Sequence, residues 1–247
     1  MKLGLTADAL LTTTRAVRRR LDFDRPVARS VLEECVEIAI QAPSGGDSQG
    51  WHWLLISDFA TKAAIAECYR RFFAAYRENR QRDDPEYWAR VGSTADTHAR
   101  NLERSPWFVI PCLAGPMGRA TDESSVFVHA NTWASIYPAV WSFMLALRER
   151  GLATCLTTNH LAYEREVAEI LEIPFESVNQ ACLLPVAYAR GTDFRPGPRH
   201  PASTVIHLER WRGSAAEQEP SVATHLTRRD SSARDRTPRF EAPPRSD

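Results

Sequence analysis

Apolar residues recur along the chain with two different periods, and these periods predict helices that alternate with a few short strands. Spacings of three and four residues are typical of one face of a helix, whereas short apolar runs bounded by turn residues indicate strands. The pattern predicts helices over residues 9–20, 30–42, 61–80, 86–103, 126–150 and 163–171. It predicts strands over residues 51–57, 107–113, 152–158 and 179–188, with an edge strand over 205–211. We therefore expect an α+β fold with α/β layers, without a repeat or an internal linker.

The expected helix over residues 126–150 is the most hydrophobic one and is apolar almost all round up to its charged end. A helix that is buried on every side lies in the centre of a large core or at a subunit interface. Pro138 falls inside this segment, so it should either kink the helix or mark its true first turn. Strand 107–113 is also apolar nearly throughout, which predicts burial on both faces. Ser30 and Glu33 form a capping-box pattern that predicts the start of the second helix.

Composition and charge indicate a globular protein without a nucleic-acid or membrane partner. The 247 residues are 43% hydrophobic, which is enough for a sizeable core. Acidic and basic residues number 31 each, so no net field favours nucleic acid or an anionic membrane. Residues 214–247 are rich in Ser, Arg, Glu and Pro, and we expect them to form a disordered tail after one domain over residues 1–213.

The five cysteines are widely spaced and lie mostly among apolar neighbours, which favours reduced core residues. No Cys/His spacing indicates a metal site. The N-terminus lacks the charge order of a secretory signal, and the longest uncharged run, residues 126–147, is interrupted by polar residues and proline. We therefore expect a cytoplasmic protein that holds no metal and spans no membrane.

The stretch QAPSGGDSQGWHW, residues 41–53, joins a helix to a strand and is the strongest candidate for a ligand-binding loop. Pro43 ends the helix because proline lacks an N–H and crowds the preceding turn. Ser44, Gly45 and Gly46 are small, so their backbone N–H groups are open to a ligand. An ordinary connecting loop is the alternative interpretation.

Arginines near the N-terminus suggest a phosphate site. The sequence TTRAVRRR places Arg15, Arg18 and Arg19 on neighbouring turns of the helix expected over residues 9–20. Guanidinium groups suit phosphate because their planar donors bind its oxygens in pairs and stay charged. A solvated arginine face is the alternative.

Two other kinds of site have less support. Ser44 with His52 or His98 would suggest a hydrolase, but Ser44 follows an expected helix and precedes an expected strand, whereas a nucleophile elbow follows a strand and precedes a helix. No GxGxxG follows a strand, so a tightly held dinucleotide is not expected.

Four segments together resemble, in order and spacing, the FMN-dependent nitroreductase family. They are TTRAVRR, APSGGDSQGW, LRERGLATC and PRHP, and the resemblance spans residues 10–211. The resemblance implies a central antiparallel or mixed sheet flanked by helices, with the long buried helix at a dimer interface. It also implies a homodimer with FMN in pockets at the subunit interface, each lined by both chains.

The resemblance implies a role for each of the quoted motifs. Arg15, Arg18 and Arg199 would hold the flavin phosphate and ribityl chain, residues 43–49 would line the flavin from the partner subunit, and residues 151–153 would run along its ring. The implied cofactor-binding residues are Arg15, Ala16, Arg18, Pro43, Ser44, Gly45, Gly46, Asp47, Gln49, Gly151, Leu152, Ala153 and Arg199. No catalytic side chain is assigned, because flavin N5 itself takes and gives the hydride.

The chain departs from the family pattern at several of these positions. Asp47 stands where Asn is usual, and its carboxylate would either lower the flavin potential or point away from the ring. Gly50 replaces the Pro that usually precedes Trp, Ala16 replaces a common Ser, and Ala153 replaces Gly. These changes bear on the reductase activity more than on flavin binding.

The implied function is an FMN oxidoreductase that takes two electrons from NAD(P)H, a transient donor in a ping-pong cycle, and passes them to a small aromatic acceptor such as a nitroaromatic or quinone. Aromatic residues in the region that covers the substrate in this family could stack on the acceptor or pack in the core: Phe72, Phe73, Tyr76, Tyr87 and Trp88. The alternatives are a specialised family member that fragments flavin, dehalogenates aromatics or oxidises a substrate, and a flavin-binding protein that is not an enzyme.

Overall fold

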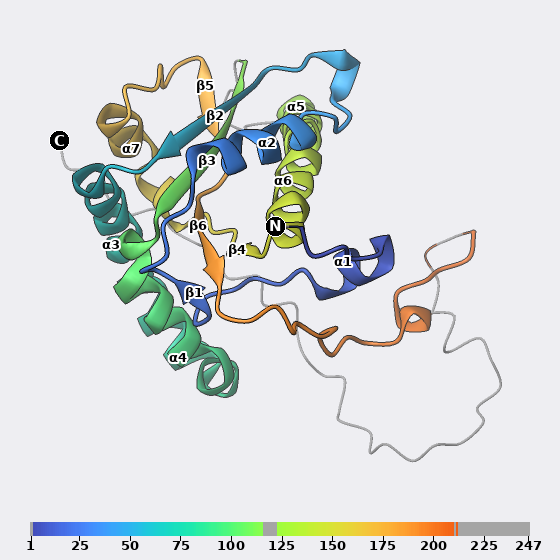
Figure 1. The fold of residues 1–247 in the computed structure, drawn as a ribbon. Helices are drawn as coiled ribbons and strands as arrows, with labels where there is room; N and C mark the ends of the chain where they lie inside the picture. The colour runs from blue at the N-terminus through green and yellow to red at the C-terminus, as the bar shows by residue number, and fades with distance from the viewer. Residues whose placement is uncertain (1, 116–122, 210, 212–247) are drawn as a thin grey trace, which may run out of the picture. The chain divides into compact units, whose positions relative to one another are not determined.

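Two groups of helices cover the two faces of a six-stranded sheet (Figure 1). The structure is a computed structural model that describes residues 2–115, 123–209 and 211. The chain forms two units, residues 1–195 and residues 196–247, and each is described by itself. The first unit contains the sheet, and the described part of the second contains a 3-10 turn at Ala202–Thr204. The expected tail over residues 214–247 lies outside the described residues.

The element order confirms an α+β fold in which helices flank an antiparallel sheet. The helices are α1 (Ala7–Thr13), α2 (Arg29–Ala39), α3 (Phe59–Asp83), α4 (Pro85–Asn101), α5 (Glu123–Ala134), α6 (Tyr137–Glu149) and α7 (Glu164–Ile170). The strands are β1 (Leu21–Asp22), β2 (Trp51–Ile56), β3 (Trp107–Ala114), β4 (Leu152–Thr154), β5 (Val178–Gln180) and β6 (Leu184–Ala189). The sheet has the order β1-β6-β3-β2, β4 pairs with β6, β5 pairs with β3, and these strand pairs are all antiparallel.

Strand β3 is central to the fold because both of its faces are buried. Val109 and Leu113 belong to the core under α2 and α6, whereas Phe108, Ile110 and Cys112 belong to the core under α3, α4 and α7. This division follows from the alternation of side chains along a strand. The burial that the sequence predicts for residues 107–113 is therefore confirmed. All five cysteines are buried and free, as expected.

No helix among the described residues is long and apolar enough to cross a membrane.

The helix expected over residues 9–20 is wrong in its second half, because α1 ends at Thr13. The hydroxyl groups of Thr12, Thr13 and Thr14 donate to carbonyls four residues back, at 2.6–2.7 Å, and β-branched residues propagate a helix poorly. The chain then becomes extended and forms a parallel bridge from Ala16 to Thr154 at the edge of β4. The arginines that follow are therefore not on neighbouring helical turns.

The single helix expected over residues 126–150 is two helices, α5 and α6, with a break at residues 135–136. Pro138 lies in the first turn of α6, where its missing N–H costs nothing, so the second of the two expected roles for it is correct. Much of α6 is buried, but it exposes Trp141, and α5 exposes Val126 and Phe127, so neither helix is buried on every side.

Several strand and cap predictions are also wrong. The strand expected over residues 179–188 is divided into β5 and β6, and β4 ends before the expected residue 158. The described residues of segment 205–211 form no strand. Helix α2 begins after Ala28, which has no side-chain hydrogen bond to the first turn, so the expected capping box is absent. The break expected after helix 61–80 is confirmed, since Asp84 caps α4 by accepting from Tyr87 N at 3.0 Å.

We predict that Lys62→Met will lower the free energy of unfolding by about 1–3 kcal/mol, the cost of leaving buried polar groups without a partner. Lys62 is buried, and its Nζ donates to the carbonyls of Ser105 at 2.6 Å and Pro106 at 3.2 Å. Urea unfolding measures the change. The control is Arg29→Met, which removes an exposed ion pair to Glu33 and should change stability by less than about 0.5 kcal/mol. Equal effects of the two substitutions would contradict a special role for the Lys62 ammonium.

Candidate functional site

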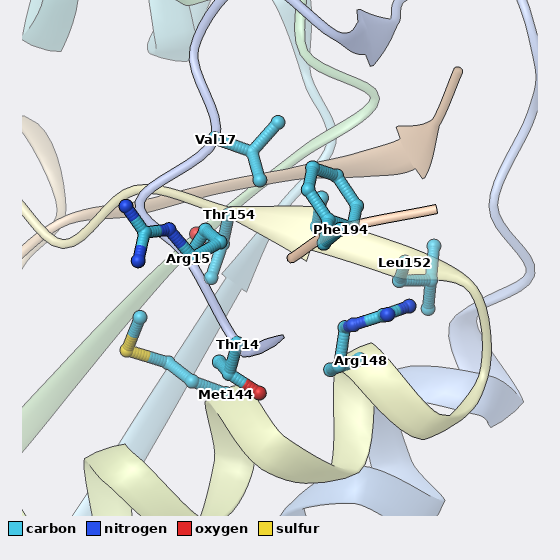
Figure 2. A pocket seen from close by; sticks show the side chains of 9 residues that line it. Thr14, Arg15, Val17, Met144, Arg148, Leu152, Thr154 and Phe194 are labelled. Atoms are coloured by element: carbon cyan, nitrogen blue, oxygen red, sulfur yellow. The ribbon is translucent and has the colours of Figure 1, made fainter. Parts of the chain in front are cut away.

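A small pocket, about 240 Å³ when the solvent at its open side is included, lies where the segment after α1 passes α6 and β4 (Figure 2). Its lining combines apolar side chains with two arginines, Arg15 and Arg148. The lining residues are Thr14, Arg15, Val17, Met144, Arg148, Leu152, Ala153, Thr154 and Phe194. A cavity of this composition can hold a ligand that has an anionic group and an apolar body.

The extended conformation after α1 explains how Arg15 reaches the pocket. Ala16 bridges Thr154, and Val17 N donates to Thr154 O at 2.9 Å, so this segment runs along the edge of β4. Side chains in an extended segment alternate between two faces. Arg15 and Val17 therefore line the pocket together, and Arg15 is half-buried there.

Arg18 lies in a different environment, beside buried groups of α3, α4 and the segment after β4. Burial, and to a smaller extent the nearby Arg18 charge, lower the pKa of His98 to about 4. Burial raises the pKa of Cys155 while Arg18 acts in the opposite direction. Tyr69 contacts His98 edge to face at 6.0 Å between ring centroids. Arg15 thus lines the pocket, whereas Arg18 lies beside His98 and Cys155.

Two arginines stack on Phe194, which lines the pocket from the segment after β6. The Arg20 and Arg148 guanidinium carbons lie 4.4 Å and 5.0 Å from the Phe194 ring centroid. Arg20 also pairs with Asp193 and donates from Nε to Arg190 O at 2.8 Å. The segment that contains Phe194 is therefore fixed to the rest of the first unit.

Arg148 is buried in the last turn of α6. Its Nη2 donates to Thr192 O at 2.9 Å. Its Nε and Nη1 are also buried, and they have no hydrogen-bond partner among the described residues. Burial, the largest cause, lowers the pKa of Arg148; the negative charge of Glu149 acts in the opposite direction, and the positive charge of Arg20 lowers the pKa further.

Gly151, Leu152 and Ala153 connect α6 to the pocket. Gly151 has φ of 73°, a left-handed conformation that favours glycine directly after a helix. Its carbonyl accepts from Ala189 N at 3.0 Å, which starts the pairing of β4 with β6. Leu152 and Ala153 then line the pocket. The structure thus brings three of the predicted residues, Arg15, Leu152 and Ala153, together at one pocket.

The loop from Pro43 to Gln49 is held in a defined shape but does not line this pocket. Gln49 N donates to Ser44 Oγ at 3.1 Å, and Gln49 Nε2 donates to Asp47 Oδ1 at 2.7 Å. Asp47 and Gln49 have φ of 53° and 46°, which is uncommon for residues other than glycine. Gly46, at φ of 60°, is suited to the same region. The Asp47 carboxylate is thus engaged by a neighbouring amide.

A contact with the junction of α5 and α6 fixes the loop. Gly45 N donates to Ser135 Oγ at 3.0 Å, and Trp51 Nε1 donates to Ser135 O at 2.6 Å. A Cβ on Gly45 would lie 2.9 Å from Asn131 Oδ1, so the close approach depends on glycine.

We predict that Ser135→Ala will lower the free energy of unfolding by about 1–2 kcal/mol, because Gly45 N loses its acceptor in a part-buried position. Urea unfolding measures the stability, and amide exchange over residues 44–49 should become faster. Thr132→Ala is the control, because its hydroxyl donates within the exposed side of α5, to Val128 O. Unchanged exchange of the loop in the Ser135 variant would show that the contact does not hold it.

Arg199 belongs to the second unit, where it is exposed and donates from Nη1 to Pro198 O at 2.8 Å. Its predicted role in holding the flavin phosphate stays a prediction.

The aromatic residues of α3 and α4 pack on one another, with Phe73 and Trp88 buried at 6.2 Å between ring centroids. Core packing, one of the two expected roles, therefore accounts for these two residues.

Six pocket residues are not among those that the sequence predicts: Thr14, Val17, Met144, Arg148, Thr154 and Phe194. One signal for Arg148 was available. Met144 and Arg148 are four residues apart and so share a helical face, which placed an arginine on the apolar side of α6. Phe194 gave no signal, because its contacts depend on the path of the chain after β6.

Comparisons with known proteins agree with this architecture. The profile of the nitroreductase family matches residues 11–188. An iodotyrosine deiodinase from Thermotoga neapolitana is 24% identical over 196 residues, which cover 79% of this chain and 94% of the relative.

Solved structures show the same fold. A BluB-like flavoprotein from Clostridium difficile superposes with a TM-score of 0.65 at 15% identity, covering 84% of this chain and 100% of that chain. An iodotyrosine deiodinase bound to FMN and 3-iodo-L-tyrosine gives a TM-score of 0.62 at 24% identity, covering 81% of this chain and 97% of that chain. A variant of an FMN- and NADPH-dependent nitroreductase from sphigopyxis sp. strain HMH gives 0.61 at 23% identity, covering 83% and 99%. Because the family profile extends over most of the chain, the chain belongs to the nitroreductase family.

Proposed function

We propose that this chain is a cytoplasmic, FMN-dependent oxidoreductase that passes two electrons from NAD(P)H, or another hydride donor, to a nitroaromatic, a quinone or a similar acceptor. The observation that carries the proposal is the pocket in which Arg15 meets Leu152 and Ala153, since these residues come from two of the family motifs far apart in sequence. Family membership supports a flavin as the ligand.

The pocket residues fit the phosphate end of FMN. A phosphate monoester removed from water needs charged donors, and Arg15 supplies one beside the apolar Val17, Met144 and Leu152. When bound, FMN supplies two-electron hydride chemistry. The remaining residues proposed to hold it are Ala16, Arg18, Gly151, Ala153 and Arg199, with Pro43, Ser44, Gly45, Gly46, Asp47 and Gln49 from the partner subunit.

Anaerobic titration tests the proposed activity. The purified protein should carry a yellow chromophore that is released as FMN, and NADH or NADPH should bleach it in the absence of oxygen. Addition of a nitroaromatic or quinone should then restore the colour. A protein that stays colourless when FMN is added would refute the proposal, whereas bound FMN that neither nucleotide bleaches would refute the nicotinamide donor.

We further propose a homodimer in which the exposed apolar side chains of α5 and α6 meet a second copy. Val126 and Phe127 of α5 are 63% and 73% exposed, and Trp141 of α6 is 41% exposed. Apolar side chains exposed in this number often mark an interface. Light scattering should give twice the chain mass, and Phe127→Asp should give the monomer. A wild-type monomer that binds FMN fully would refute the dimer.

Reductive dehalogenation of an aromatic is the second candidate, favoured by the iodotyrosine deiodinase relative. The two reactions separate when dithionite reduces the flavin and 3-iodo-L-tyrosine is the acceptor. Release of iodide under these conditions, with no turnover of nitroaromatics, would favour dehalogenation.

A further inference from the structure

Arg148 has an unusual combination of burial and missing partners. The residue is 5% exposed, lines the pocket, and uses Nη2 to donate to Thr192 O at 2.9 Å. Nε and Nη1 have no hydrogen-bond partner among the described residues. A buried donor of a charged group costs free energy when it is left unpaired, so a partner is expected to complete this site.

The neighbours of Arg148 do not meet this need. Phe194 lies against the guanidinium, 5.0 Å from ring centroid to carbon, but its side chain has no oxygen or nitrogen atom to accept from the N–H donors. The Glu149 carboxylate accepts from Gly4 N at 2.7 Å and from Leu5 N at 3.1 Å. Among the described residues, no carboxylate forms an ion pair with Arg148.

We propose that Arg148 binds the phosphate group of the ligand in this pocket and so makes the site select FMN over flavins that lack a phosphate. This inference rests on the proposed function. The phosphate accepts from the donors of Arg148 that now lack partners. Because phosphate has three terminal oxygens, it can accept from Arg148 and from a second cation at the same time.

Arg15 provides that second cation. In Figure 2 the two guanidinium groups lie on opposite sides of Thr14, with Arg148 beneath Phe194. Arg148 is buried and held by Thr192, whereas Arg15 is half-buried. Arg148 therefore forms the fixed part of the proposed phosphate site, and the Arg15 side chain has to turn toward Arg148 for both groups to reach one phosphate.

A purely structural role would have different consequences. Arg148 lies at the C-terminal end of α6, where a cation interacts favourably with the helix dipole, and it holds Thr192 and Phe194. Loss of these contacts would destabilise the flavin-free protein and would weaken the binding of every flavin to the same degree. The two roles therefore differ in whether the substitution weakens FMN binding more than riboflavin binding.

The test compares dissociation constants of FMN and riboflavin, measured by flavin fluorescence, for wild type and Arg148→Met. Loss of a hydrogen bond to a charged group is expected to raise the dissociation constant of FMN about 10- to 100-fold, whereas that of riboflavin should change by less than about threefold. Arg20→Met is the matched control, because Arg20 stacks on the same Phe194 ring without lining the pocket. It should preserve the ratio of the two constants.

The proposal is overturned if Arg148→Met weakens the binding of FMN and of riboflavin equally, or leaves both dissociation constants unchanged. Arg148→Gln, which also lacks the charge, replaces the methionine variant if that variant does not fold, and the same ratio decides.

A second measurement separates failure of this inference from failure of the proposed function. If the wild type binds neither flavin, the proposed function is wrong, and inorganic phosphate becomes the probe. Thermal unfolding of the flavin-free protein in phosphate and in chloride, at equal ionic strength, should then show a phosphate stabilisation that Arg148→Met abolishes. Absence of that stabilisation in the wild type would overturn the phosphate site.

Discussion

Replacing Arg15 by methionine is expected to weaken FMN binding by about 10- to 100-fold, because one charged donor to the phosphate is lost. Riboflavin, which has no phosphate, should lose less than about threefold in affinity. Methionine keeps the length of the apolar stem beside Val17 and Met144, so the pocket should retain its shape. Fluorescence titration with both flavins measures the change, and thermal unfolding without flavin checks that the variant is folded.

Arg19→Met is the control for this prediction. Arg19 is exposed, does not line the pocket, and donates from Nη2 to Ser93 Oγ on α4. Its loss should leave both flavin affinities within about threefold, because surface contacts of this kind contribute little. A larger loss of FMN affinity in the Arg19 variant than in the Arg15 variant would refute the assignment of the pocket.

The double variant of Arg15 and Arg148 connects this prediction with the proposed phosphate site. If both guanidinium groups bind one phosphate, the loss of FMN affinity in the double variant will differ from the sum of the two single losses, because they share a partner. Independent effects would mean that the two arginines act on different parts of the ligand.

The fold class was predictable because much of its signal is local. The apolar run of residues 107–113 needs two covered faces, and β3 has them. The wrong elements are those decided by contacts across the chain. Ala16 is extended and not helical because it pairs with Thr154 at the edge of β4. The spacing of apolar residues within 9–20 cannot indicate a pairing with a residue so far along the chain.

The candidate site was predictable where a motif carries it and not where tertiary contacts create it. Arg15, Leu152 and Ala153 were found from family motifs and lie at one pocket. Arg18 is expected to act beside Arg15; it lies near His98 in this structure, and its role at the phosphate stays a prediction. Arg148 looked like the charged end of a helix, since its burial depends on Phe194, which lies far along the chain.

Acidification is expected to destabilise the flavin-free protein strongly between pH 6.5 and pH 4. Burial, with a smaller contribution from Arg18, lowers the folded-state pKa of His98 from 6.5 to about 4, and burial lowers that of His160 from 6.5 to about 3. Both rings are buried, and no described residue accepts or donates a hydrogen bond at His98 Nε2 or at either nitrogen of His160.

The sign follows from proton binding. Below pH 6.5 the unfolded chain takes up a proton on each histidine, whereas the folded chain does so only near pH 4 for His98 and near pH 3 for His160. Stability is therefore lost as the pH falls through this range, at about 1.4 kcal/mol per pH unit for each histidine. The two together should lower the free energy of unfolding by about 4 kcal/mol between pH 7.5 and pH 5.

Urea unfolding at pH 7.5 and pH 5 measures this loss, and the comparison that decides is the difference between the two pH values within each variant. His98→Gln and His160→Gln should each reduce that difference by about 2 kcal/mol, whatever their effect on stability at pH 7.5. His52→Gln, at an exposed position of β2, is the matched control and should leave the difference unchanged. If the two buried-site variants lose as much stability on acidification as the wild type, the acid sensitivity arises elsewhere and these histidines are not its source.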